Sequence, residues 1–151
     1  MKSKPEPGDL RERALRLLAR REHSRFELAR KLGQAGFAPD EIEPLLDEFE
    51  EKKWLSDRRF AESYIADHRA RAGSIKLAYD LRQRGVSETV IEGVLRENRD
   101  TELERARQIW QKKFSSAPAD SAEKARQTRF MQSKGFTSEV IQLILGAKAG
   151  E

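Results

Sequence analysis

Residues 54–86, WLSDRRFAESYIADHRARAGSIKLAYDLRQRGV, decide the fold because they contain two helical segments joined by a short turn. Apolar residues recur at helical spacing in the first segment, at Phe60, Ala61, Tyr64 and Ile65. Ser56 is placed to cap this helix, because its hydroxyl can accept a hydrogen bond from a free backbone N–H. Ala-Gly-Ser at 72–74 interrupts the pattern, and Ser74 is expected to cap a second helix that ends at Gly85.

The flanking segments repeat this plan around three glycines, Gly36, Gly85 and Gly135, which lie 49 and 50 residues apart. Apolar residues stand four positions before and one position after each glycine: Leu32 and Phe37, Leu81 and Val86, Met131 and Phe136. A left-handed glycine followed by an apolar residue is typical of the Schellman helix end. A further helix is expected after each glycine, beginning at Pro39, Ser87 or Thr137.

The repetition predicts an all-α protein of three tandem three-helix repeats, none large enough to bury its own core well. We place a disordered leader and the three repeats at residues 1–8, 9–55, 56–98 and 99–151. The first repeat opens with a capping-box spacing from Asp9 to Glu12, and a second capping box runs from Ser24 to Glu27. No stretch keeps a period of two, so no strand is expected.

Composition bounds the possible functions. The 151 residues include 30 basic and 26 acidic side chains, so the net charge is only +4 although 37% of residues are charged. Such a mixed surface allows an anionic partner without demanding one. The absence of cysteine excludes disulfides and thiolate metal sites and favours a cytoplasmic location. No apolar run approaches the roughly 20 residues that span a bilayer, and the N-terminus lacks the apolar core of a signal peptide.

Catalytic motifs are missing from the sequence. The two histidines, His23 and His68, stand in no metal-ligand spacing, and no phosphate-binding loop of the Walker type occurs. His68 borders an apolar stripe, which favours a structural role. No pair of residues is marked as a general acid and base. We therefore expect a protein that is not an enzyme and that needs no metal, cofactor or small-molecule substrate.

A helix–glycine turn–helix outline also suggests a DNA-reading motif, but the charge of the third helix argues against it. This helix carries seven acidic residues and no basic residue before Lys52: Asp40, Glu41, Glu43, Asp47, Glu48, Glu50 and Glu51. Phosphates would repel such a surface. Sequence-specific reading of the major groove is therefore excluded.

Basic residues gather instead on the first and second helices of the later repeats, and the net charge changes from −1 over 9–55 to +1 over 56–98 and +3 over 99–151. Eight residues are candidate contacts to a partner or to DNA: Arg58, Arg69, Arg71, Lys76, Arg82, Arg84, Arg126 and Arg129. Several could instead be neutralised within their own helices, through Arg58–Glu62, Asp67–Arg71 and Lys76–Asp80–Arg84. Arg69 and Arg82 have no acidic residue four positions away and are the strongest candidates.

Large aromatic residues mostly fall on the apolar stripes, namely Trp54, Tyr64 and Trp110. Core packing is expected for these three. Tyr79 is the exception, since it lies outside the stripe of its helix.

Several of these signals, in order, resemble the RecX family. The resemblance is carried by Ser24-Arg25-x-Glu27-Leu28-x-x-Lys31-Leu32, by Gly36-Phe37, by Trp54-Leu55-Ser56-Asp57-x-x-Phe60-Ala61, and by Gly73, Ile75, Leu81 and Arg84-Gly85-Val86. It covers about residues 10 to 146. It implies three tandem three-helix repeats in an elongated, curved array.

The resemblance also implies a function. RecX-like proteins bind the RecA recombinase, especially its filament on DNA, and restrain strand exchange, ATP hydrolysis and the co-protease activity that triggers the SOS response. A monomer is expected, with its basic face near DNA phosphates in the filament groove and its acidic faces toward RecA. Two other functions remain open: a nonspecific single-stranded nucleic-acid binder and a protein-only helical scaffold.

Overall fold

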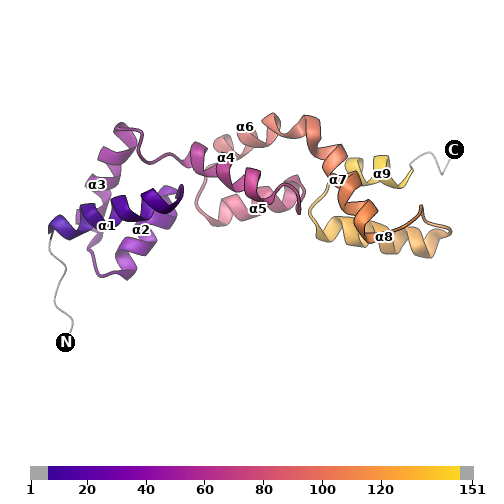
Figure 1. Cartoon of the computed structure of the whole chain (residues 1–151), viewed down its shortest axis with the longest axis horizontal. Coiled ribbons are helices and arrows are strands. Elements are labelled where there is room, and N and C mark those ends of the chain that lie inside the picture. Colours follow the sequence, from indigo (N-terminus) through magenta and orange to yellow (C-terminus); the bar gives the residue numbers. More distant parts are fainter. Residues whose placement is uncertain (1–6, 147–151) are drawn as a thin grey trace.

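The computed structural model describes residues 7–146, which form nine α-helices and no strand. The helices follow in threes: α1 (Pro7–Arg20), α2 (Arg25–Gln34) and α3 (Pro39–Glu51); α4 (Asp57–His68), α5 (Ser74–Gln83) and α6 (Glu88–Glu97); α7 (Arg99–Lys113), α8 (Ser121–Ser133) and α9 (Ser138–Leu145). Figure 1 shows the three groups in a row, with α1 and α9 toward opposite ends of an elongated molecule. The predicted all-α fold of three tandem three-helix repeats is confirmed.

Each group, called a unit below, closes around its own apolar cluster. The first two clusters each bury nine residues, whereas the third buries five: Ala106, Met131, Phe136, Ile141 and Leu145. In the third unit Gln127 occupies the place that Leu28 and Leu77 take in the others, and it is buried. Its amide oxygen accepts a hydrogen bond from Trp110 Nε1 at 2.8 Å, and its nitrogen donates to the Ser116 carbonyl at 3.2 Å. A satisfied polar group therefore replaces a leucine in the smallest core.

The three glycine helix ends are Schellman motifs, as predicted. Gly36, Gly85 and Gly135 have φ values of 104°, 81° and 92°. The N–H of the following apolar residue reaches back five positions in each case: Phe37 to Leu32 at 3.2 Å, Val86 to Leu81 at 3.1 Å, and Phe136 to Met131 at 3.3 Å. These bonds satisfy carbonyl groups that would otherwise have no partner at the helix end.

Helix starts agree with the sequence at several points and differ at two. Ser24 and Glu27 form the expected capping box, and the Ser56 hydroxyl caps α4. Asp9 lies inside the first turn of α1 rather than at its cap, because that helix begins at Pro7. The N-cap of α5 is Gly73, not Ser74, and no side chain caps this helix. Of the expected leader, residues 1–6 lie outside the part of the chain described.

Contrary to the expectation from the sequence, Trp54 does not pack in the core. It is 42% exposed and packs on the rim of the first core, where its ring centroid lies 5.5 Å from that of Phe49. The cations of Arg11 and Lys52 lie 5.9 and 4.8 Å from the centroid of its ring. Tyr79 is 57% exposed, in agreement with its position outside the apolar stripe.

Neighbouring units meet through the ends of their second helices, α2, α5 and α8. At the start of α2, the Ser24 hydroxyl donates to the Arg84 carbonyl at the end of α5, at 2.7 Å. The Arg25 N–H donates to the Asp57 carboxylate of α4 at 2.8 Å. The cap residue of α2 is thus bound to the C-terminus of α5, and a carboxylate of the second unit satisfies one N–H of the α2 N-terminus.

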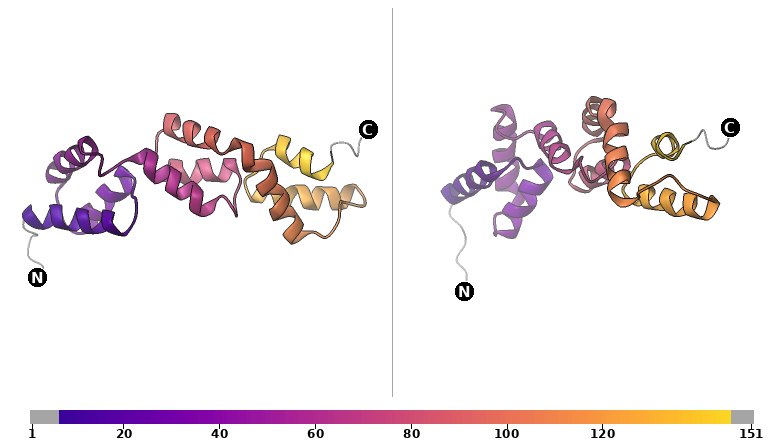
Figure 2. Two further views of the ribbon diagram at one scale, coloured as in Figure 1. Left: turned by 45° about the horizontal axis from the view of Figure 1, so that its top comes forward. Right: turned by 45° about the vertical axis from the view of Figure 1, so that its right-hand side comes forward.

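The second junction repeats this arrangement with different residues. At the start of α5, Gly73 N–H donates to the Lys134 carbonyl at 2.7 Å and Ile75 N–H donates to the Gly135 carbonyl at 2.9 Å. Ser74 N–H donates to the Glu102 carboxylate of α7 at 3.0 Å, so the third unit satisfies first-turn N–H groups of α5 without a side-chain cap. The views in Figure 2 show α2, α5 and α8 in three successive units along the molecule.

Two glycines are required by these junctions as well as by their backbone angles. A Cβ atom at Gly85 would lie 2.4 Å from Phe26 Cβ, and one at Gly135 would lie 2.4 Å from Lys76 Cβ. Both distances are too short for carbon atoms. The glycines therefore end their own helices and also allow the preceding unit to approach.

Substitution of Gly85 by valine is expected to lower the free energy of unfolding by at least about 1–2 kcal/mol, because a β-branched residue resists the left-handed conformation. The contact with Phe26 adds to this cost. Gly33→Ala is the matched control, since Gly33 lies within α2 with open space around it. That variant should gain about 0.5–1 kcal/mol. Urea unfolding of both variants gives the comparison, and a Gly85→Val protein as stable as the parent would contradict the junction argument.

Candidate functional site

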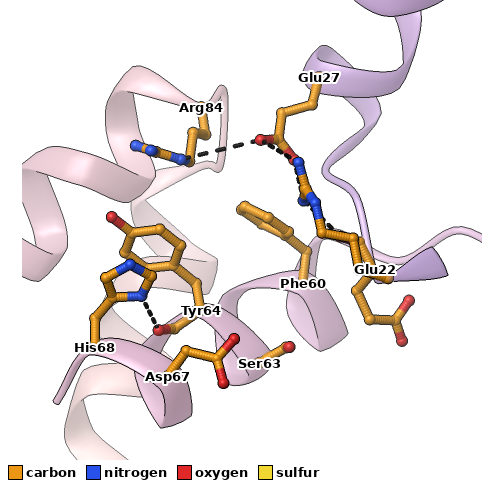
Figure 3. Close-up of a pocket in the computed structure, with 9 residues that line it drawn as sticks. Glu22, Glu27, Phe60, Ser63, Tyr64, Asp67, His68 and Arg84 are labelled. Carbon is orange, nitrogen blue, oxygen red and sulfur yellow. Dashed lines mark hydrogen bonds and ion pairs between the residues drawn. The ribbon is translucent and has the colours of Figure 1, made fainter. Parts of the chain in front are cut away.

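A pocket of about 220 Å³ lies between the first and second units. Its lining has acidic side chains from Glu22, Glu27 and Asp67 and basic side chains from Arg21 and Arg84. Figure 3 shows Glu22, Glu27, Asp67 and Arg84 converging from the two units around Phe60 and Tyr64. Three acidic and two basic side chains nearly balance, so the pocket offers little excess charge to a ligand.

Aromatic and polar contacts hold one wall of this pocket. Tyr64 and His68 stack with ring centroids 3.9 Å apart, and Arg84 lies 4.7 Å over the Tyr64 ring. The Tyr64 hydroxyl donates to Asp80 at 2.9 Å. Burial, together with this hydrogen bond, raises the pKa of Tyr64 to about 12. Tyr64 therefore stays protonated and serves the packing of the wall rather than proton transfer.

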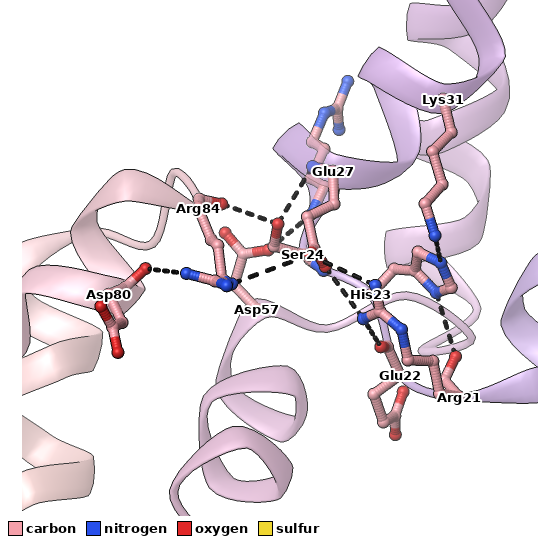
Figure 4. A network of polar contacts seen from close by, with 10 residues as sticks. Arg21, Glu22, His23, Ser24, Glu27, Lys31, Asp57, Asp80 and Arg84 are labelled. Atoms are coloured by element: carbon pink, nitrogen blue, oxygen red, sulfur yellow. Dashed lines mark hydrogen bonds and ion pairs between the residues drawn. The ribbon is translucent and has the colours of Figure 1, made fainter. Parts of the chain in front are cut away.

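Glu27 is the centre of the polar network in Figure 4. It accepts from Arg21 at 3.1 Å and from the Ser24 N–H at 3.2 Å, and Arg84 lies 4.0 Å away. Burial alone would raise the pKa of Glu27, but these hydrogen bonds outweigh it and hold the pKa below its usual value. The carboxylate thus links the capping box of α2 to the end of α5.

His23 is a buried part of the same network, with 1% of its surface exposed. Its Nδ1 lies 3.1 Å from the Arg21 carbonyl, and its Nε2 lies 2.8 Å from Lys31 Nζ. A neutral ring satisfies both contacts, by donating to the carbonyl and accepting from the ammonium. Burial lowers the pKa of His23 from its ordinary value of 6.5.

Arg25 joins α2 to the acidic helix α3. It forms ion pairs with three carboxylates, Glu43 and Asp47 at 2.8 Å and Glu50 at 2.5 Å. Burial alone would lower the pKa of Arg25, but the hydrogen bonds to these carboxylates outweigh it and raise the pKa above its ordinary value. Part of the acidic surface predicted for α3 is therefore neutralised within the unit.

The six basic candidates of the second unit do not form one cluster. Arg69 and Arg71 lie at the Gly73 end of α5, facing the third unit, whereas Arg84 lies at the junction with the first unit. Lys76 and Arg84 are eight residues apart on one helical segment, which corresponds to about 12 Å along the axis. The two ends of α5 therefore belong to different junctions.

Several basic candidates are paired with acidic residues. Arg58 pairs with Glu62 at 3.3 Å and also with Glu97. Lys76 lies 3.9 Å from Asp80, and Arg126 pairs with Glu123 at 2.8 Å. Arg82 pairs with Glu88, so the inference that its charge is free was wrong. The search of positions four residues away missed this partner, because Glu88 lies six residues on, beyond the Gly85 turn.

The remaining candidates have no carboxylate partner within residues 7–146. Arg69 donates to the Asn98 side chain at 3.3 Å, and Arg71 donates to the Asp67 carbonyl at 3.4 Å rather than to its carboxylate. Arg129 is exposed, and its side chain has no hydrogen bond or ion pair in the described chain. These three arginines keep their charge available.

The outer face of α5 presents apolar surface to solvent. Ile75 is 56% exposed and Tyr79, one turn later on the same face, is 57% exposed. Arg82 follows three residues after Tyr79 and is held in place by Glu88. An exposed aromatic residue beside an ordered arginine is the composition typical of protein–protein contacts.

A second pocket, of about 330 Å³, contains basic residues that the sequence analysis did not select. Lys112, Lys113 and Lys134 line it together with Arg71 and Phe130. Lys112 and Lys113 are adjacent at the end of α7, a signal that could have been noticed. Their proximity to Arg71 depends on the junction between the second and third units, which no local pattern shows.

The described residues give no support to a metal site or a membrane-spanning helix. Within residues 7–146, no group of three or more His, Cys, Asp or Glu residues is arranged to hold a metal ion. Among the described helices, none combines the length and the apolar character needed to cross a membrane.

Each of the three units matches a model of a known protein family. The family models described as the first, second and third three-helix domains of RecX match residues 11–49, 56–95 and 100–145. Regulatory protein RecX of Ralstonia nicotianae is 41% identical over 95% of this chain and 91% of its own length. The protein of the same name from Chromobacterium violaceum is 42% identical, over 97% and 95%.

Solved structures agree on the fold. The crystal structure of RecX from Lactobacillus salivarius superposes with a TM-score of 0.81 at 19% identity, covering 96% of this chain and 97% of that one. A second crystal structure of regulatory protein RecX has a TM-score of 0.80 at 21% identity, covering 91% of this chain and 72% of its own.

Protonation of His23 is expected to destabilise the fold. The unfolded chain binds this proton near pH 6.5, whereas burial opposes it in the folded chain. Stability is therefore present above that pH and falls as the pH is lowered through it. His23→Gln should lose less melting temperature than the parent between about pH 7.5 and about pH 5.5. Both proteins keep His68, so parallel pH curves would show that His23 does not carry the effect.

Proposed function

This chain belongs to the RecX family of regulatory proteins, and from that premise we propose that it binds the RecA recombinase on single-stranded DNA and restrains the filament. The domain matches along all three units carry the proposal. The protein acts by binding rather than by catalysis, as a monomer in the cytoplasm. Its target activities are strand exchange, ATP hydrolysis and SOS co-protease activity.

The elongated array suits a steric mechanism. Tandem units linked end to end present a long surface, which can follow a helical polymer over several subunits. Lying in the filament groove, such an array would exclude an incoming duplex and hinder the movements that accompany ATP hydrolysis. The acidic surface of α3 would face RecA, away from the DNA phosphates that repel it.

The outer face of α5 is the proposed contact with RecA. Ile75 and Tyr79 are exposed there, and Arg82 is already ordered by Glu88. Burial of an aromatic side chain and an ordered arginine against a partner costs little additional side-chain entropy. This assignment gives Arg82 a role in protein contact.

The other basic candidates divide by their pairing. Arg69, Arg71 and Arg129 have no carboxylate partner in the described chain and are proposed to lie near DNA phosphates. The paired residues are proposed as secondary contacts that exchange an internal partner for an external one: Arg58, Lys76, Arg84 and Arg126. Arg84 also holds the first junction, so its substitution would affect folding and binding together.

The direct test is ATP hydrolysis by RecA on single-stranded DNA with and without this protein. We expect hydrolysis to fall as the protein is added, and the protein alone to hydrolyse no ATP. Unchanged hydrolysis at a stoichiometric excess, with no binding to the filament, would reject the proposal. A protein-only scaffold unrelated to RecA would give that result.

Tyr79→Ala is expected to raise the concentration needed for half-maximal inhibition of RecA by about tenfold or more, because an exposed aromatic anchor is lost. Leu143→Ala is the matched control, since Leu143 is 60% exposed on α9, in a different unit. Circular dichroism should show the same helix content for both variants. Equal inhibition by the two variants would place the RecA contact elsewhere.

A further inference from the structure

The structure assigns a single-stranded DNA site to the groove between the second and third units, the pocket lined by Ala70, Arg71, Ile109, Lys112, Lys113, Phe130 and Lys134. We call it the basic groove. It deepens the proposed function by naming where the chain touches DNA, and it makes a claim that holds without RecA. The groove combines positive charge with an apolar floor.

Charge is the first argument for this ligand. Four cations from three separate segments line the groove, and no described carboxylate does. Three other pockets, by contrast, each include at least one carboxylate in their lining. Arg71 is bound only to a backbone carbonyl, and Lys112, Lys113 and Lys134 have no ion pair in the described chain. Among these four pockets the basic groove therefore has the largest excess of positive charge, and it attracts anionic groups most strongly.

Helix ends near the groove reduce its charge without cancelling it. Lys112 and Lys113 lie in the last turn of α7, and Lys134 caps the end of α8. A helix C-terminus is equivalent to about half a negative charge, so even three such ends would offset only about 1.5 of the four positive charges. The Lys134 carbonyl is already bound by Gly73 N–H, which removes one competing acceptor.

The apolar floor selects an unpaired base. Phe130 is partly buried between the groove and Phe114, which meets its ring edge-on with centroids 5.4 Å apart. Lys113 and Lys134 each place their ammonium 5.5 Å from the Phe130 centroid. An aromatic surface ringed by cations can stack one base while the lysines bind the adjacent phosphates. Bases in a duplex are paired and stacked, so only a single strand can reach this floor.

The experiment measures fluorescence anisotropy of a labelled oligothymidine of about 12 nucleotides with the full chain and no RecA. We expect Lys112→Gln with Lys134→Gln to weaken binding about tenfold at low salt. The slope of log affinity against log salt should become shallower by about 1.4, because two phosphate contacts are lost. The matched control is Arg30→Gln with Lys124→Gln, which removes the same charge at exposed positions outside the groove.

The base contact is tested from both sides of the interface. Phe130→Leu should weaken binding at least about fivefold with an unchanged salt slope. An abasic oligonucleotide should bind the parent protein correspondingly less well, which tests the floor without altering the fold. A duplex of the same length should bind more weakly than the single strand.

Three results would overturn the assignment. Equal losses in the groove variant and the control would mean general attraction, and equal affinity for duplex, abasic and normal strands would remove the base contact. Binding of an acidic peptide such as polyglutamate, without binding of any oligonucleotide, would identify a protein ligand instead. The two proposals can fail separately. Absence of oligonucleotide binding would not affect the RecA assay, and absence of RecA inhibition would not affect the oligonucleotide assay.

Discussion

The array depends on one contact, the meeting of a helix N-terminus in one unit with a helix C-terminus in the next. At the start of α2 the Ser24 hydroxyl donates to a carbonyl at the end of α5, and at the start of α5 the Gly73 and Ile75 N–H groups donate to carbonyls at the end of α8. A carboxylate from the following unit takes one further N–H, from Asp57 in one case and Glu102 in the other. The start of each of these second helices therefore meets the end of the second helix in the following unit. Since a unit of this size buries little apolar surface, each one gains stability from its neighbour.

The repeated glycine turn was visible in the sequence because it is a local feature. Its backbone angle, its flanking apolar residues and the cap of the next helix all lie within a few positions of Gly36, Gly85 or Gly135. The same turn serves a second purpose that the local pattern does not show. Phe26 and Lys76 lie against Gly85 and Gly135 from the preceding unit, at distances that exclude a Cβ atom. Helix boundaries could thus be predicted, whereas the register between units could not.

Charges were predicted less well, because their partners are set by tertiary structure. The spacing rule identified the partner of Arg58 in Glu62 but missed the pairing of Arg82 with Glu88 across a turn. Arg84 finds Glu27, which lies far from it in the sequence. The Ser74 hydroxyl is a plausible cap by local rules, yet the backbone N–H groups at that position are already committed to the third unit. The errors at Arg84 and Ser74 arise from contacts between units, whereas the error at Arg82 arises from a contact across the Gly85 turn within the second unit.

A net charge of +4 over 151 residues gives little long-range attraction for an anionic ligand. Attraction therefore depends on where basic side chains lack an acidic partner. In the first unit, Arg25 alone occupies three carboxylates of α3. At the second junction, by contrast, the lysines that end α7 and α8 meet Arg71 without any described carboxylate between them. Charges separated by more than about 8 Å are largely screened at physiological salt. A ligand in the basic groove is therefore attracted by the local positive charge and is little affected by the negative charge of the first unit. The end-to-end contact that joins the second and third units also creates the region of the surface suited to an anionic strand.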